Sequence, residues 1–437
     1  MPAVVDLAEA FAALDEVNPL RLAGRVTEVT GLVVRATIPG VRVGELVCID
    51  DGLQRLRAEA VGFRGEEVVL MPLGPVAGIG PEALVSPMGR SLGLQVGEGL
   101  LGRVLDGLGQ PCDGLGPVGG PLETWPVDRP SPPPLFRQRI TRPLSLGVRA
   151  LDGLLTVGQG QRLGLFAGSG VGKSTLLGQI ARHTDADVAV IALVGERGRE
   201  VREFLEDTLG PDGRARAVVV CATSDEPAIV RLKCAFVATA IAEWFRDRGQ
   251  RVLLMMDSLT RFARAQREVG LAAGEPPARQ GYPPSVFALL PRLLERAGNG
   301  ERGSITGIYS VLVAGGDLDE PIADEARGVL DGHIVLSRAL AERGHFPAID
   351  LLPSLSRIMP AVADADHLRA ATRLRELLAA YEDKRDLIAL GAYKRGADPR
   401  VDEALTKLER INRYLCQGVG EASTLDEARR GLLALTT

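Results

Sequence analysis

Residues 167–175 have the composition of a loop that binds phosphate groups. They read Ala-Gly-Ser-Gly-Val-Gly-Lys-Ser-Thr, they follow an apolar run at residues 162–166, and a helical pattern follows at residues 175–181. A strand, a glycine-rich turn and a helix in this order wrap backbone N–H groups around phosphate oxygens. Lys173 would reach the β- and γ-phosphates, and the Ser174 hydroxyl would ligate Mg²⁺. The predicted nucleotide-binding residues of this loop are Gly168, Ser169, Gly170, Val171, Gly172, Lys173, Ser174 and Thr175.

Two carboxylates follow other apolar runs and are candidates for chemistry at the phosphates. Asp257 comes directly after residues 252–256, and Glu196 closely follows residues 188–194. If both runs are parallel strands, their carboxyl ends meet at the edge of the sheet where ligands bind. Asp257 would hold a Mg²⁺-bound water, and Glu196 would orient a water for in-line attack on the γ-phosphate. In the alternative interpretation each carboxylate caps a helix, or Glu196 is a surface acid.

The elements that must position these residues can be traced along the chain. Residues 144–336 alternate apolar runs with helical patterns, which predicts a doubly wound parallel sheet. Residues 24–86 contain short β-branched runs separated by turn residues, which predicts a small β-barrel. Residues 121–134 are proline-rich and are expected to form an extended connector. Residues 364–435 carry apolar residues at helical spacing and predict a small helical domain.

Composition argues against several classes of protein. The chain has a net charge of -5 and 4% aromatic residues, whereas nucleic-acid-binding proteins are usually basic. The 5 cysteines form no C-x-x-C pair, so a structural zinc site is not expected and reduced thiols of a cytoplasmic protein fit better. Residues 1–19 are acidic and lack the pattern of a signal peptide, although residues 6–14 could form an amphipathic helix. No apolar run is long enough to predict a membrane span.

Three arginines recur at helical spacing after Asp257. Arg261, Arg264 and Arg267 follow one another at intervals of three. Such a run is usually a solvated face or an interface with another subunit, and we interpret it in this way.

Five longer motifs extend the pattern beyond the phosphate loop. They lie at residues 165–174, 256–261, 281–287, 330–338 and 345–350. Together they resemble the catalytic subunits of the rotary ATPases and, more closely, the type III secretion export ATPases of flagella and injectisomes. Ala167 stands where the general phosphate-loop pattern has glycine, as is usual in the export subfamily. The resemblance covers nearly the whole chain and fades at both ends.

The resemblance implies an architecture and an activity. It implies an α/β fold with a RecA-like core and a parallel sheet at residues 91–350, a preceding β-barrel at residues 1–90 and a helical domain at residues 351–437. It implies ATP hydrolysis with Mg²⁺ by a ring-shaped homohexamer that energises type III protein export. Two alternatives are a rotary ATPase catalytic subunit, whose acidic lever motif is missing at residues 392–399, and an RNA translocase of the transcription-terminator type. The second would need exposed aromatic residues in the barrel, where only Phe63 occurs.

The same resemblance assigns roles to individual residues. Glu196 and Lys173 would be catalytic, with Arg197 beside Glu196. Arg357 falls where the family's arginine finger reaches the γ-phosphate bound to a neighbouring subunit, although it could instead pair with a local carboxylate. Phe346 matches the aromatic residue that stacks on adenine. Residues 416–419 match a segment that closes over the base.

The resemblance also implies partners and a location. A stator or regulator protein is expected at the N-terminal region, a coiled-coil stalk protein in the central pore, and export chaperones and secreted proteins at the C-terminal domain. The expected location is the cytoplasm, peripheral to the inner-membrane export gate, with no nucleic acid bound. Residues 37–42 resemble injectisome members and residues 390–394 resemble flagellar ones, so the sequence leaves this choice open.

Overall fold

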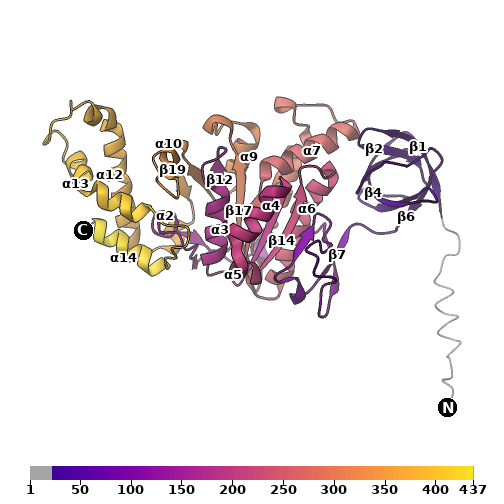
Figure 1. Cartoon of the computed structure of the whole chain (residues 1–437), viewed down its shortest axis with the longest axis horizontal. Coiled ribbons are helices and arrows are strands. Elements are labelled where there is room, and N and C mark those ends of the chain that lie inside the picture. Colours follow the sequence, from indigo (N-terminus) through magenta and orange to yellow (C-terminus); the bar gives the residue numbers. More distant parts are fainter. Residues whose placement is uncertain (1–21, 437) are drawn as a thin grey trace, which may run out of the picture. The chain divides into compact units, whose positions relative to one another are not determined.

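The computed structural model describes residues 22–436, and these form two compact units that divide between Leu92 and Gly93 (Figure 1). The helix expected at residues 6–14 and the acidic segment expected to dock a stator lie outside the described residues.

The first unit is a closed β-barrel with the strand order β1-β2-β5-β4-β3-β6. Its strands are β1 Gly24–Thr30, β2 Val33–Thr37, β3 Leu46–Asp50, β4 Arg55–Arg64, β5 Glu67–Pro72 and β6 Leu84–Pro87. Alternate side chains fill the interior, where Val34, Ile49 and Leu70 have no exposed surface. The turn between β3 and β4 contains Gly52 with a φ of 86°, a conformation that glycine adopts without strain. The barrel predicted from the sequence is confirmed.

The second unit is built around a nine-stranded sheet with the order β19-β18-β12-β17-β15-β13-β14-β8, and β16 pairs with β17 outside this path. Neighbouring strands are parallel except at β18–β19 and β16–β17. The strands are β8 Val104–Asp106, β12 Arg162–Ala167, β13 Val188–Glu196, β14 Ala217–Thr223, β15 Arg251–Asp257, β16 Gly298–Asn299, β17 Ser304–Leu312, β18 Gly332–Leu336 and β19 Ile349–Ser356. Their unbroken apolar character follows from burial on both faces. The predicted parallel sheet is confirmed.

Helices cover both faces of this sheet (Figure 1). They are α2 Arg149–Leu154, α3 Lys173–His183, α4 Gly198–Glu203, α5 Gly210–Ala215, α6 Ala228–Asp247, α7 Leu259–Ala273, α8 Pro284–Leu294, α9 Pro321–Val329, α10 Arg338–Glu342 and α11 Met359–Val362. Helix α6 packs along β13, β14 and β15, and its long apolar stretch is buried between them and α7. Residues 204–209 form a π-helical turn between α4 and α5.

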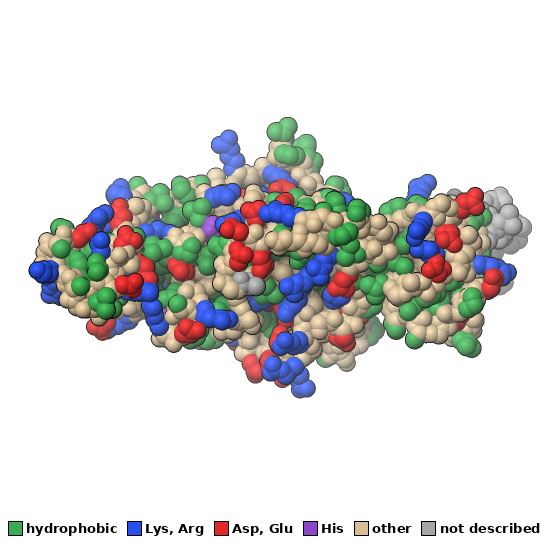
Figure 2. All heavy atoms as spheres, turned by 90° about the horizontal axis from the view of Figure 1, so that it is seen from above, with side chains coloured by type: hydrophobic (Ala, Val, Ile, Leu, Met, Phe, Trp, Pro, Cys, Tyr) green, Lys and Arg blue, Asp and Glu red, His purple; other side chains and the backbone are tan. Residues whose placement is uncertain are grey.

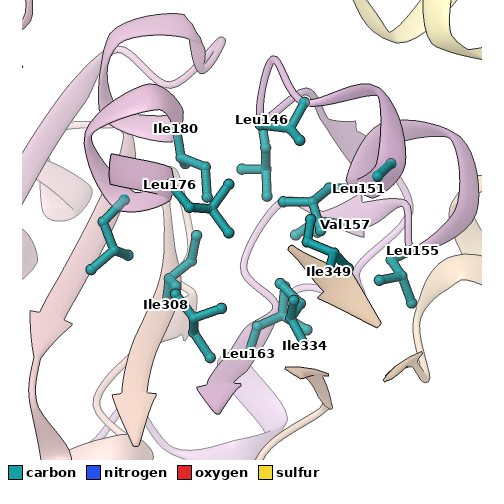
Figure 3. Packing of buried hydrophobic residues seen from close by; sticks show 14 of the residues in the cluster. Leu146, Leu151, Leu155, Val157, Leu163, Leu176, Ile180, Ile308, Ile334 and Ile349 are labelled. Atoms are coloured by element: carbon teal, nitrogen blue, oxygen red, sulfur yellow. The ribbon is translucent and has the colours of Figure 1, made fainter. Parts of the chain in front are cut away.

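The phosphate-loop helix α3 is anchored by the main apolar cluster of the second unit (Figure 3). Leu176 and Ile180 of α3 point toward Leu163 of β12 and Ile308 of β17. Leu151 of α2 belongs to the same cluster. Because a close-packed core has few voids into which a side chain can move, this packing fixes the position of α3 over the sheet.

The proline-rich segment is more ordered than a plain connector. Residues Glu123–Pro126 form strand β9, which pairs antiparallel with β7 at Gly93–Val96. The Glu123 carboxylate accepts hydrogen bonds from Trp244 of α6 and from Arg248, which directly follows this helix. Arg296, whose guanidinium is buried with Glu243, donates to the Val127 carbonyl at 2.9 Å. These contacts fasten the segment to the second unit, which its proline content did not predict.

The C-terminal region is helical, as predicted, with α12 Ala365–Ala389, α13 Pro399–Leu415 and α14 Leu425–Thr436. These helices pack on one another, and α14 also packs on α2. Strand β19 crosses the expected start of the helical domain at residue 351. Residues 351–356 therefore belong to the central sheet. Within residues 22–436 no helix is both long enough and apolar enough to cross a membrane.

Candidate active site

The glycine-rich loop joins the end of β12 to the start of α3. Strand β12 ends at Ala167 and α3 begins at Lys173. Gly170 and Gly172 have φ values of 77° and 87°, which place both in the left-handed region that glycine tolerates best. Ser174 and Thr175 are exposed in the first turn of α3, where backbone N–H groups lack helical partners. The loop therefore has the shape and the polarity to cradle phosphate oxygens.

Three predicted site residues converge at the carboxyl edge of the sheet. The Lys173 ammonium forms an ion pair with the Asp257 carboxylate and lies 3.9 Å from Glu196 Oε1. All three side chains are at most 11% exposed. They come together because β13 and β15 are adjacent parallel strands that end at Glu196 and Asp257, while β17 separates β15 from β12. The structure thus places one cation between two carboxylates, at the point where the loop would hold a γ-phosphate.

Ser310 of β17 supports this cluster and was not identified from the sequence. Its hydroxyl is buried and donates a 2.7 Å hydrogen bond to Asp257 Oδ1. The bond fixes the carboxylate in the direction of Lys173. A serine near the carboxyl end of a buried strand, at the end of the sheet where ligands bind, is the signal that could have indicated it.

Arg261 belongs to the site, which corrects its interpretation as part of a solvated or interface face. It lies in the first turn of α7, and its guanidinium forms an ion pair with Glu196 Oε1. Gly195 makes room for it, since a Cβ at this position would lie 3.1 Å from the Arg261 side chain. Burial lowers the pKa of Arg261, and the nearby charge of Arg264 lowers it further. Arg264 is exposed, and Arg267 lies over the ring of Tyr282.

Arg197 does not join the cluster in the single chain. Its side chain is 74% exposed, and its guanidinium pairs with Glu200 at 3.1 Å. The cation that contacts Glu196 is Arg261 rather than its neighbour in sequence. A catalytic role for Arg197 stays a prediction.

Phe346 lies beside the loop, as expected for a residue that contacts the base of a nucleotide. Its ring is 45% exposed, and a Cβ on Gly172 would lie 3.6 Å from two ring carbons. The Phe346 carbonyl accepts a 2.9 Å hydrogen bond from the Gln417 N–H. The segment 416–419 is therefore bonded to the backbone of Phe346, although it is more than 60 residues away in the chain.

Arg357 lies far from the other predicted residues of its own chain. It follows β19, whose last residue, Ser356, pairs with Gly332 at the start of β18. The loop follows the opposite end of the sheet, where Ala167 of β12 pairs with Leu336. Arg357 is exposed, and its guanidinium contacts the Arg327 carbonyl at 3.4 Å. No carboxylate among residues 22–436 forms an ion pair with it, so the alternative of a local pair is not what the structure contains.

The oxygen donors near Lys173 suit a Mg²⁺ ion that a nucleotide brings with it. Asp257 supplies a buried carboxylate and Ser174 an exposed hydroxyl, and hard cations prefer such oxygen ligands. Within the described part of the chain, no three His, Cys, Asp or Glu side chains form a cage for a metal ion. Two protein donors are consistent with Mg²⁺ held chiefly by phosphate oxygens and water.

The surface of the second unit carries basic and acidic side chains in alternation rather than one uniform basic patch (Figure 2).

Three family models match the chain in succession. They are the ATP synthase alpha/beta family beta-barrel domain at residues 26–89, the nucleotide-binding domain of the same family at residues 147–356, and the T3SS EscN ATPase C-terminal domain at residues 363–434. The chain is thus similar over most of its length to an ATP synthase subunit, with a C-terminal domain of the secretion type.

Individual relatives and solved structures agree with these models. The flagellum-specific ATP synthase of Bacillus subtilis (strain 168) is 53% identical over 94% of this chain and 95% of its own length. The type 3 secretion system ATPase of Xanthomonas euvesicatoria is also 53% identical, over 94% of each chain. The assembled ATPase EscN of enteropathogenic E. coli matches with a TM-score of 0.89 and 45% identity, over 95% of this chain and 100% of that chain. The chain, an ATPase, therefore belongs to the family of flagellum-specific and type III secretion ATPases, which are related to the ATP synthase alpha/beta subunits.

Proposed function

We propose that this chain hydrolyses Mg·ATP at sites shared between neighbouring copies in a homohexameric ring and so energises type III protein export. The observation that carries the proposal is the position of Arg357. It is an exposed arginine with no carboxylate partner among the described residues. It lies at the amino ends of the parallel strands, whereas Lys173, Glu196 and Asp257 lie at their carboxyl ends. A site completed by Arg357 must take this residue from another copy of the chain.

Within one chain, each residue of the site has a separate role in hydrolysis of the γ-phosphate. Lys173 neutralises charge on the β- and γ-phosphates. Glu196 accepts a hydrogen bond from the attacking water and orients it in line with the leaving oxygen. Arg261 forms an ion pair with the Glu196 carboxylate and so holds it in place. When bound, Mg²⁺ supplies Lewis-acid stabilisation of the phosphate charge, and Asp257 and Ser174 are the residues that would hold it.

The neighbouring copy would supply the remaining charge. An arginine finger stabilises the charge that develops in the transition state and raises the rate by about 10³ to 10⁵. One related solved structure is that of assembled EscN, and another is that of assembled EscN in complex with its central stalk EscO. These relatives support a ring of this chain around a coiled-coil stalk.

The wider setting is also proposed by analogy. A stator or regulator would bind the N-terminal region, and chaperones with secreted proteins would contact the helices after residue 363. The chain would act in the cytoplasm, peripheral to the inner-membrane apparatus, without nucleic acid. Flagellar and injectisome relatives match at equal identity, so the proposal covers both systems.

The test is specific ATPase activity measured against protein concentration, with RNA absent and then present. Activity per subunit that rises with concentration and ignores RNA supports a shared site. Strong stimulation by RNA would instead indicate a translocase and would contradict the export proposal. Lys173→Ala is the control, because loss of the phosphate-binding cation must abolish turnover in either case.

A further inference from the structure

The segment 416–421 is held over the phosphate-loop helix by hydrogen bonds to its carbonyl groups. Gln179 of α3 donates from Nε2 to the Gly418 carbonyl at 3.2 Å and to the Glu421 carbonyl at 3.4 Å. Arg182, one turn further along α3, donates from Nη2 to the Val419 carbonyl at 2.8 Å. Two side chains of the phosphate-loop helix thus donate to three carbonyls of one short segment, and the Glu421 carbonyl also accepts from Gln417 Nε2 at 2.7 Å.

Gln179 is an unusual residue for its position. It is 2% exposed and lies between Leu176 and Ile180, which pack into the apolar core. A buried amide in such surroundings is costly unless its hydrogen bonds are made. Its donors are used on the segment 416–421. The buried amide therefore joins α3 to this segment.

The same segment forms one side of the place expected for a base. The Gln417 N–H donates to the Phe346 carbonyl at 2.9 Å, and the exposed Phe346 ring lies against Gly172 of the phosphate loop. The Gln417 side chain is fixed from the other side, where its Oε1 accepts from the Arg149 N–H at 2.8 Å. The distance between ring and segment is therefore set by α3 and α2 together.

We propose that Gln179 and Arg182 are positioning residues for the base of the bound nucleotide. Their hydrogen bonds fix the position of segment 416–421 relative to Phe346. Base binding then depends on the position of the phosphate-loop helix. Gln179 donates to this segment, whereas Arg182 shares its guanidinium between the Val419 carbonyl and the Thr208 carbonyl of the π-helical turn. We expect both side chains to act on affinity for the base and not on the chemical step. The inference rests on the proposed binding of ATP at this loop.

The test separates base binding from phosphate binding. Gln179→Met keeps the volume and removes both donors, and Arg182→Gln removes the longer reach to Val419. Steady-state kinetics give kcat and KM for Mg·ATP, and Mg·tripolyphosphate, which has no base, is used as a competitive inhibitor. Each variant is expected to raise KM for ATP about fivefold to tenfold, since each loses one or two hydrogen bonds, with kcat and the inhibition constant of tripolyphosphate unchanged.

Two matched variants control for general loss of packing. Gln266→Met removes another buried glutamine amide, which donates to the Ser285 hydroxyl on a different helix pair. Arg216→Gln removes an arginine that donates to carbonyls at the C-terminal end of α3, including Ala181 at 3.0 Å and, just after the helix, Thr184 at 2.7 Å. Both controls are expected to lower the melting temperature as much as the test variants and to leave KM for ATP unchanged.

Each contrary result has a distinct meaning. If Gln179→Met and Arg182→Gln weaken ATP and tripolyphosphate equally, the residues support the phosphate loop and the inference is wrong. If neither variant changes KM for ATP, the segment does not help to bind the base and the inference is again wrong. If tripolyphosphate fails to inhibit the wild-type chain, the proposed nucleotide site itself fails.

Discussion

Lys173 and Arg357 of one chain lie beyond opposite ends of the parallel strands in the central sheet. Lys173 follows the end of β12, at the level where Ala167 pairs with Leu336 of β18. Arg357 follows Ser356, which pairs with Gly332 at the other end of β18. The four residue steps between these levels correspond to roughly 13 Å along the strand, which is farther than an arginine side chain extends. The two side chains can meet at one phosphate only if they come from different copies of the chain.

Glu196→Gln is expected to bind ATP normally and to lose turnover by at least about 10²-fold, because an amide cannot act as the general base that orients and polarises the water. Equilibrium binding of a fluorescent ATP analogue and single-turnover hydrolysis measure the two effects separately. Glu203→Gln, an exposed position on the next helix, is the control and should change neither. Near wild-type turnover of Glu196→Gln would exclude the role given to this carboxylate.

Arg261→Met is expected to lower kcat by about tenfold to a hundredfold, because the buried Glu196 carboxylate loses its ion-pair partner. Without Arg261, Glu196 keeps only the Lys173 ammonium at 3.9 Å and can rotate away from the water. Arg264→Met removes an exposed arginine three residues further along the same helix and serves as the control. Equal kcat values for the two variants would mean that the ion pair has no part in catalysis.

Asp113 should make stability depend on pH in the acidic range. Its carboxylate accepts hydrogen bonds from Arg103 Nε at 2.7 Å and Nη2 at 2.8 Å, which hold the pKa of Asp113 well below its usual range. A carboxyl with a lowered pKa stabilises the fold above its unfolded-state pKa, near about 4, and this stabilisation is lost as the pH falls toward the folded-state pKa. Urea unfolding of the wild type should therefore show a fall in the free energy of unfolding below about pH 4.

Asp113→Asn should remove this part of the pH dependence. At neutral pH it should lower the free energy of unfolding by about 1–3 kcal/mol, since Arg103 loses its charged partner but keeps its hydrogen bonds to the Gly116 and Pro117 carbonyls. Asp366→Asn breaks an exposed pair with Arg369, whose side chains are 62% and 71% exposed, and should have little effect. If the free energy of unfolding of Asp113→Asn still falls steeply at acidic pH, another group is responsible for the pH dependence.

Much of the site could be predicted because its signals are local. Lys173 lies in a loop with a fixed pattern, and Glu196 and Asp257 each end an apolar strand, so their meeting follows from parallel pairing alone. Arg261 could not be assigned in this way. Its contact with Glu196 depends on β15 being next to β13, and the order of strands in a sheet is not encoded by spacing along the chain. Its place in the first helical turn after Asp257 was a usable signal, because that turn lies at the same edge of the sheet.

The fold was predictable to a similar depth. Short β-branched runs between turn residues indicated the barrel, and apolar runs between helical patterns indicated the parallel sheet, because strands buried on both faces are apolar along their length. Strand β9 was missed, since its partner β7 is far away in sequence and prolines flank the pairing residues. The hydrogen bonds from Gln179 to segment 416–421 could not be predicted either, because they join residues about 240 positions apart through carbonyl groups that any residue supplies.

The most direct test of a shared site mixes two inactive variants. Glu196→Gln and Arg357→Ala are each expected to hydrolyse ATP very slowly when alone. In a mixed ring, an Arg357→Ala subunit keeps an intact Glu196, and a Glu196→Gln neighbour supplies the missing arginine, so about a quarter of the interfaces in an equal mixture are complete. The account predicts that mixing restores ATPase activity to a substantial fraction of the wild-type value. If the mixture stays as inactive as its components while both variants still assemble, Arg357 does not act across the interface and the central claim is wrong.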